Sequence, residues 1–348
     1  MIKQISEDLK VDEVLRTTCE SFIRNRDALR ESFRYEGMAM HLMGAAVMSS
    51  ADDKIEVADY KKCEEFLDSK TGVFSPLRGL LKMPMVINLA LSSDRDDYYE
   101  RVQNVYEDII ESRNSKDERL LLAAMIIASS TKNPDVISDL IETADRIYNK
   151  TDAAGRLFSD MSAYVTAAGV AVSGVRDVMA YSEELELCKE ELAEPSGIGV
   201  VPEELCMLLA ADEGDAKDKC DRVKEISAAL GAKKIGLGSG SAAAMLAALS
   251  SLDMTPDEIA EKVSEADKFL KEQKGFGFMG TGAATRHMYA AMLVCIAYAD
   301  KTSAGDIGSA AAVNDAITNR YVASAMLSQQ VMLQTQMMLL SQTANPIV

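Results

Sequence analysis

The chain has 348 residues, of which 48% are hydrophobic and 26% charged, a balance typical of folded globular proteins. It contains 55 acidic residues against 37 lysines and arginines, so its net charge is −18 and its pI is near 4.7. An anionic surface repels phosphate backbones and anionic lipids, so nucleic-acid and membrane partners are excluded. Six cysteines without a CxxC pair, and no secretory signal, predict free, buried thiols and a cytoplasmic location.

Short, nearly uncharged segments rich in Ala, Leu and Met recur along the chain. Their first residues are 35 to 47 positions apart. Each is long enough for a buried helix, and no apolar run reaches the ~18 residues that a membrane helix needs. The segments are 38–48, 85–91, 120–128, 164–172, 205–211, 242–249 and 288–297.

Charged segments with helical periodicity separate the apolar ones. In 256–273, Ile259, Val263 and Phe269 belong to an apolar stripe at a spacing of about 3.6 residues. Thr255 is a favourable N-cap, and Glu258 stands at the position that completes a capping box. The pattern therefore predicts amphipathic helices. Two further segments have equivalent stripes: Val136, Leu140, Ala144 and Ile147 after Asn133, and Tyr98, Val102, Val105 and Ile109 after Ser93.

Glycine-containing turns follow the charged segments. Glycine ends a helix readily because it tolerates a left-handed backbone at the C′ position. The hydrophobic residue after the glycine, such as Val73, Leu237 or Phe276, is expected to fold back over the core. The turns are 70–75, 153–159, 195–202, 233–241 and 274–280.

These patterns predict an all-α protein made of tandem helix hairpins of roughly 40 residues each. About six units and a final half unit result, with the apolar helices inside and the charged helices outside. Such hairpins stack either into an open α-solenoid or into a closed α/α toroid, and the sequence leaves both open. No alternating Val/Ile/Thr pattern predicts a substantial sheet.

The pattern changes near residue 300. We expect a helical-repeat domain over 1–300, a linker over 301–312 and a C-terminal Met/Gln-rich helix over 313–348. Residues 321–348 contain no charged side chain. This helix is interpreted as a cap on the last repeat, with a partner-binding or dimer-forming helix as the alternative.

Several segments resemble an uncharacterised bacterial family, domain of unknown function (DUF) 4003. They are FRYEGMAMHLMGAAVMSS (33–50), KTGVFSPLRGLLK (70–82), VYEDI (105–109), the KGFGF segment that leads to Arg286, and the Ala/Met/Gln-rich tail. The resemblance covers nearly the whole chain. It implies an intracellular bacterial protein and supplies no activity or catalytic residue.

No motif in the sequence carries a catalytic or cofactor signature. Residues 275–280 match GxGxxG, but an amphipathic helix precedes them, whereas a dinucleotide site requires a strand there. We therefore interpret them as a helix-ending turn. Acidic clusters lie at predicted helix starts, where the helix dipole explains them. The chain has two histidines, and neither belongs to an HxxxH or HxxE motif that could bind zinc. The sequence therefore predicts no metal site, and we expect no cofactor.

Five polar residues on or beside the apolar segments are the candidate binding residues: His41, Arg78, Asn88, Arg286 and His287. If the inner helices line a concave face or a cavity, these side chains are exposed there. The simpler interpretation is that they are core or turn residues whose polar atoms bind backbone carbonyl groups.

Two hypotheses for function follow. The preferred one is an interaction scaffold, because helical repeats build extended concave surfaces that bind a peptide or protein without chemistry. The alternative is an α/α-toroid enzyme that acts on a small molecule in an axial cavity. The chain has no Trp and only 5% aromatic residues, which disfavours sugar-active toroids. A homo-oligomer formed through the C-terminal helix is also considered.

Overall fold

The computed structural model describes residues 12–298, apart from 35–36, 51–55, 74, 80, 152–160, 176, 194–200, 202, 213, 238–241, 244 and 277–280. Within these residues the chain forms fourteen α-helices and one 3-10 helix, and no β-strand. The predicted all-α class is therefore confirmed. The linker over 301–312 and the C-terminal helix over 313–348 lie outside the described residues.

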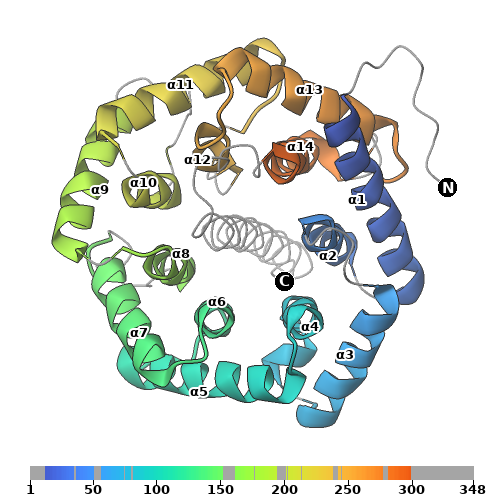
Figure 1. Ribbon diagram of the computed structural model, residues 1–348, viewed down its shortest axis with the longest axis vertical. Helices are drawn as coiled ribbons and strands as arrows, with labels where there is room; N and C mark the ends of the chain where they lie inside the picture. The colour runs from blue at the N-terminus through green and yellow to red at the C-terminus, as the bar shows by residue number, and fades with distance from the viewer. Residues whose placement is uncertain are drawn as a thin grey trace, which may run out of the picture.

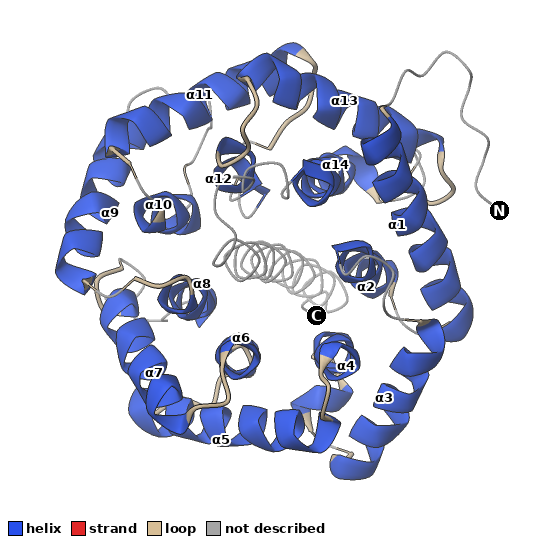
Figure 2. Cartoon of the chain, viewed as in Figure 1, coloured by secondary structure: helices blue, strands red, loops and turns tan. Residues whose placement is uncertain are grey.

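The helices alternate along the chain between two concentric layers (Figures 1 and 2). The outer layer consists of α1 (Glu13–Ser32), α3 (Val57–Lys70), α5 (Arg95–Arg113), α7 (Pro134–Tyr148), α9 (Val178–Ala193), α11 (Ala216–Ala232) and α13 (Pro256–Glu272). The inner layer consists of α2 (Met38–Ser50), α4 (Lys82–Leu91), α6 (Leu120–Ser130), α8 (Met161–Val172), α10 (Glu203–Ala211), α12 (Met245–Ser250) and α14 (Gly282–Tyr298). The 3-10 helix η1 (Pro76–Arg78) precedes α4.

The outer helices bury one face and expose charged residues on the other. On α13, the predicted stripe residues Ile259, Val263 and Phe269 are fully buried. On α5, Tyr98, Val102, Val105 and Ile109 are buried, as predicted. An amphipathic helix placed between core and solvent satisfies both faces, which explains why the charged segments form the outer layer.

Side-chain caps fix where the outer helices begin. Thr255 and Glu258 form the predicted capping box at the start of α13. Asn133 caps α7 through the backbone N–H of Asp135 (3.0 Å). Asp94 and Asp215 cap α5 and α11 in the same way, so these members of the acidic clusters stabilise helix starts.

The predicted glycine turns are only partly correct. Phe276 and Leu237 fold back into the core, as expected, but Val73 is 79% exposed. The prediction for Val73 is therefore wrong, and the buried hydrophobic residue between α3 and α4 is Leu77 of η1 instead. After α11 the left-handed residue is Lys234 (φ 62°) rather than a glycine.

The ends of the described chain meet where α1 packs against α13 and α14. The sequence pattern assigned no element to residues 13–32, and α1 supplies this contact. The carboxylate of Asp12, the N-cap of α1, lies 2.9 Å from the Lys262 ammonium group on α13 and accepts a hydrogen bond from the Tyr298 hydroxyl of α14. The buried Arg26 donates to the Lys274 carbonyl (2.9 Å).

Different hairpins use equivalent polar contacts between their two helices. The Tyr98 hydroxyl on α5 donates to the Met125 carbonyl on α6 (3.3 Å), and Tyr181 on α9 donates to Met207 on α10 (3.2 Å). Each tyrosine is the fourth residue of its outer helix. A recurring contact at one helix position indicates that these hairpins pack in the same way.

The Asp12 contacts make stability depend on pH. Burial alone raises the pKa of Asp12, but the Leu15 N–H, the Tyr298 hydroxyl and Lys262 outweigh it and lower the pKa to about 2. A lowered pKa stabilises the fold above the unfolded-state value of 3.8, and this contribution is lost as the pH falls towards 2. Asp12→Asn keeps an N-cap, so we expect a loss of about 1 kcal/mol at pH 6, limited by solvent screening.

Urea unfolding at pH 6 and pH 2.5 checks this prediction. The difference between the variant and the parent protein should shrink at the lower pH. Asp94→Asn, at the α5 N-cap, is the matched control. An Asp12→Asn effect that stays constant with pH would contradict the assignment.

Substitution by alanine at two helical glycines is expected to change protein stability in opposite directions. A Cβ on Gly44 of α2 would lie 2.8 Å from Cδ1 of the fully buried Leu29, whereas a Cβ on Gly231 of α11 meets nothing within 4 Å. We therefore expect Gly231→Ala to stabilise by about 0.5–1 kcal/mol and Gly44→Ala to destabilise by about 1 kcal/mol, measured by thermal unfolding. Equal stabilisation by both would show that α1 and α2 pack less closely.

Candidate functional site

Of the five candidate residues, the structure brings together Arg286 and His287, which are adjacent on α14. Both side chains reach Asp267 on the outer helix α13. Arg286 Nε donates to Asp267 Oδ1 (2.6 Å), and His287 Nε2 lies 3.6 Å from the same oxygen. The three side chains are between 11% and 14% exposed. They form a largely buried polar cluster between the two layers, which we call the Asp267 cluster.

The remaining polar atoms of this cluster bind the backbone. Arg286 Nη1 donates to the Phe276 carbonyl (3.3 Å) and so fixes the turn after α13. The Gly236 N–H donates to His287 Nδ1 (3.2 Å), which leaves the ring proton on Nε2, facing Asp267. His287 therefore has no ring nitrogen free to act as a base, and the cluster ties two turns to the last hairpin.

His41 lies apart from this cluster, in α2. Its side chain is 3% exposed, and Nε2–H donates to the Phe33 carbonyl (2.8 Å). Phe33 is the C-cap of α1, where helix carbonyl groups lack helical partners. His41 thus binds the chain that connects the first two helices, as the simpler sequence interpretation predicts.

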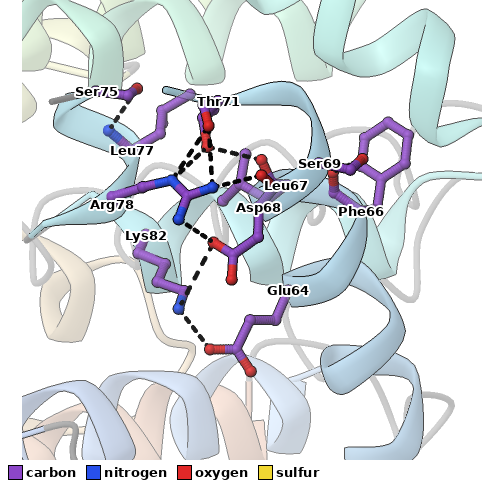
Figure 3. A network of polar contacts seen from close by, with 10 residues as sticks. All are labelled: Glu64, Phe66, Leu67, Asp68, Ser69, Thr71, Ser75, Leu77, Arg78 and Lys82. Carbon is purple, nitrogen blue, oxygen red and sulfur yellow. Dashed lines mark hydrogen bonds and ion pairs between the residues drawn. The ribbon is translucent and has the colours of Figure 1, made fainter. Parts of the chain in front are cut away.

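Arg78 in η1 holds the end of α3 (Figure 3). Its guanidinium group donates to the carbonyls of Asp68 and Thr71, the latter at 2.9 Å from Nη2. Nearby, the Lys82 ammonium group of α4 pairs with Glu64 and reaches Asp68 at 4.0 Å. Arg78 therefore satisfies the free carbonyls at a helix C-terminus, a position where positive charge is also favoured by the helix dipole.

Asn88 on α4 also bonds locally. Its Nδ2 donates to the Pro84 carbonyl one turn earlier (2.8 Å), and its Oδ1 accepts from Ser129 of α6 (3.4 Å). Ser129 contacts the Tyr98 hydroxyl in turn (3.1 Å). This chain of hydrogen bonds links two neighbouring inner helices and one outer helix.

The sequence pattern gave no indication of the basic residues that cap the inner helices. Arg222 on α11 donates to the carbonyls of Ser250, Leu252 and Met254 at 2.6–2.8 Å. Arg101 on α5 reaches the Ala128 carbonyl in α6 (2.9 Å). Each arginine is the seventh residue of its outer helix, and that recurrence is the signal that could have identified them.

A pair of buried thiols was also missed. Cys188 of α9 and Cys220 of α11 are fully buried and hydrogen-bonded to each other, and the Cys220 thiol also contacts the Cys188 carbonyl (3.9 Å). The bond to Cys220, together with burial, raises the pKa of Cys188. All six cysteines are free, as predicted, and Cys295 alone is only partly buried.

Within the described residues, no group of three or more His, Cys, Asp or Glu side chains has a geometry that could hold a metal ion. In the same part of the chain, no helix combines the length and hydropathy needed to cross a bilayer. The polar side chains found between the layers are suited to holding helix ends and turns together.

The Asp267 cluster is expected to behave as a buried ion pair. Arg286→Met leaves the buried Asp267 carboxylate without its guanidinium partner, which should cost about 3 kcal/mol of unfolding free energy. The double variant Arg286→Met/Asp267→Leu removes both charges and should cost less than Arg286→Met alone. Urea unfolding of the single and double variants measures the difference.

Lys217→Met at the exposed Lys217–Asp221 pair is the control and should change nothing measurable. If the loss of unfolding free energy in the double variant equals the sum of the losses in the two single variants, Arg286 and Asp267 act independently. The buried-pair assignment is then wrong.

Comparison with known proteins gives one result. No curated protein and no solved structure matches the chain. A family model described as "Protein of unknown function (DUF4003)" matches residues 25–321, from the middle of α1 to a point beyond α14. This match covers most of the 348 residues and includes the segments 33–50, 70–82, 105–109 and the KGFGF segment on which the resemblance was based, but not the C-terminal tail. The chain therefore belongs to the DUF4003 family.

Proposed function

We propose that this protein is a cytoplasmic helical-repeat scaffold, an α/α toroid whose inner surface binds a peptide or protein segment. The observation that carries the proposal is the separation of charge between the two layers. The inner helices carry apolar side chains on every side, and their few polar groups are held by outer-helix carboxylates or backbone carbonyls.

Recurring contacts support the repeat. Tyr98 and Tyr181 make the same bond in two hairpins, and Arg101 and Arg222 make the same cap in two hairpins. Each hairpin alone would leave an apolar inner helix uncovered, so neighbours must stack. The contacts of α1 with α13 and α14 favour a closed toroid over an open solenoid.

The inner layer also defines the chemistry of the partner. An apolar, uncharged wall gains most from burying apolar surface and gains little from a charged or phosphorylated ligand. Helices that present apolar faces into a groove are a common mode of peptide recognition. We therefore assign the partner as an uncharged helical segment rich in Leu and Met. The six free thiols support the cytoplasm as the location.

The alternative, an α/α-toroid enzyme, requires several polar groups that converge on one substrate. The candidate residues instead lie on four elements, α2, η1, α4 and α14, and their polar atoms bind Phe33, Thr71, Pro84, Asp267 and Phe276. No specific observation favours catalysis over binding, so we retain the scaffold as the proposed function.

Photo-crosslinking from the two layers tests the proposal. A benzophenone side chain replaces the partly buried Ile126 of α6 or Val172 of α8, and the controls carry it at the exposed Glu107 of α5 or Glu142 of α7. Expressed in its native cell, the protein should yield a defined crosslinked segment from α6 and α8 and none from the control positions. Equal products from both layers, or products with the outer layer only, would contradict the proposal.

A further inference from the structure

Two buried thiols lie together between neighbouring outer helices. Cys188 of α9 and Cys220 of α11 are both fully buried, and their thiol groups are hydrogen-bonded to each other. Cys220 Sγ also lies 3.9 Å from the Cys188 carbonyl oxygen, although the two residues are 32 positions apart in the chain. The packing of α9 against α11 in the outer layer (Figure 1) therefore brings these sulfur atoms into contact.

Two ion pairs hold α9 and α11 in register around the thiols. The Lys219 ammonium group of α11 lies 2.6 Å from the Glu184 carboxylate of α9. The Lys224 ammonium group of α11 lies 3.8 Å from the Glu191 carboxylate of α9. In each helix, one of these charged residues precedes the cysteine and the other follows it. The contact between the two sulfur atoms is thus fixed from both sides.

The two thiols differ in acidity. The hydrogen bond to Cys188 lowers the pKa of Cys220 against the opposing effect of burial, and the ammonium groups of Lys224 and Lys219 lower it further. The same hydrogen bond, together with burial, raises the pKa of Cys188. Burial raises the pKa of the other four cysteines, which are Cys19, Cys63, Cys206 and Cys295. Because the thiolate is the nucleophilic form of cysteine, Cys220 is the expected nucleophile among the six.

Burial also selects the oxidant that can reach this pair. Neither cysteine has exposed surface, so a large or charged reagent reaches it only when the helices separate. Hydrogen peroxide is small and uncharged, so a brief local opening is enough to admit it. A thiolate that attacks peroxide becomes a sulfenic acid, which condenses with a neighbouring thiol to form a disulfide. Cys220 and Cys188 supply the thiolate and the neighbouring thiol.

We propose that Cys220 and Cys188 form a peroxide-reactive dithiol whose oxidation joins α9 to α11 by a disulfide bond. The Cys220 thiolate attacks one oxygen of hydrogen peroxide, the O–O bond breaks, and the hydroxide that leaves takes up a proton to become water. The Cys188 sulfur then attacks the Cys220 sulfur, so that the S–S bond forms and the S–O bond breaks. The departing oxygen leaves as a second water. Two thiols and one peroxide thus give one disulfide and two waters, and a small thiol reduces the disulfide again by exchange.

The disulfide would join two hairpins that are consecutive in the chain. α9 packs against α10, and α11 packs against α12. A cross-link between distant positions restricts the unfolded chain more than the folded one, so the oxidised protein should unfold at a temperature several degrees higher. The effect is confined to the outer layer. It therefore goes beyond the proposed function and does not depend on what the inner surface binds.

Peptide mapping of the purified full-length protein tests the proposal. The reduced protein is treated with a small excess of hydrogen peroxide, its remaining thiols are alkylated in denaturant, and it is digested without reductant. The expected product is a peptide pair joined through Cys188 and Cys220, and dithiothreitol should reverse both the bond and the rise in unfolding temperature. Oxidation confined to Cys295, the one partly buried cysteine, would overturn the proposal. A disulfide to Cys206, or no disulfide at all, would do the same.

Serine variants test the two roles, because serine keeps a hydrogen-bonding group but forms no disulfide. In Cys188→Ser the sulfenic acid on Cys220 has no partner, so dimedone should label Cys220 several-fold more than in the parent protein. In Cys220→Ser the remaining Cys188 should stay unlabelled. Cys206→Ser, at a buried cysteine of α10, is the matched control and should form the disulfide as the parent does. Equal labelling of the first two variants would contradict the assignment of Cys220 as the nucleophile. If a variant does not fold, the peptide map of the parent protein alone decides the proposal.

Discussion

The structure depends on one constraint, which is that an uncharged apolar helix must be covered on every side. An outer amphipathic helix covers one side of each inner helix, and neighbouring inner helices cover two more. A linear stack leaves its two ends open, whereas the proposed closed toroid has none. In that proposal, the contacts of α1 with α13 and α14 have the same physical origin as the contacts within each hairpin.

Polar side chains between the layers serve this arrangement. Helix C-termini leave carbonyl groups without partners, and burying them costs free energy unless a donor reaches them. Arg101 and Arg222 supply such donors to the inner helices, and Arg78 supplies them to α3. Arg286 donates one hydrogen bond to Asp267 and another to the Phe276 carbonyl, in the turn after α13. A guanidinium group suits this role because it presents several donors in a fixed geometry.

The same constraint connects architecture to the proposed function. In the proposed toroid, the outer and lateral sides of the inner helices are covered, so the sides that face its centre form the proposed binding surface. A partner bound at this surface is stabilised by hydrophobic burial and needs no charged groups. The surface therefore differs in character from the chain as a whole, whose net charge is −18.

The sequence by itself determined the all-α class, the apolar and amphipathic segments and the caps at Asn133 and Thr255, because periodicity and capping depend on residues close together in the chain. For His41 it left open exposure on an inner surface or burial with a bond to a backbone carbonyl, and the structure has the side chain buried and bonded to Phe33. Only the tertiary structure brought Asp267 to Arg286 and His287, Arg222 to the end of α12 and Cys188 to Cys220. These pairs come from different helices, and the way helices pack sets their distances. The local pattern also assigned Val73 to the core, but Val73 is exposed and Leu77 is buried, because burial here depends on how the chain packs between α3 and α4.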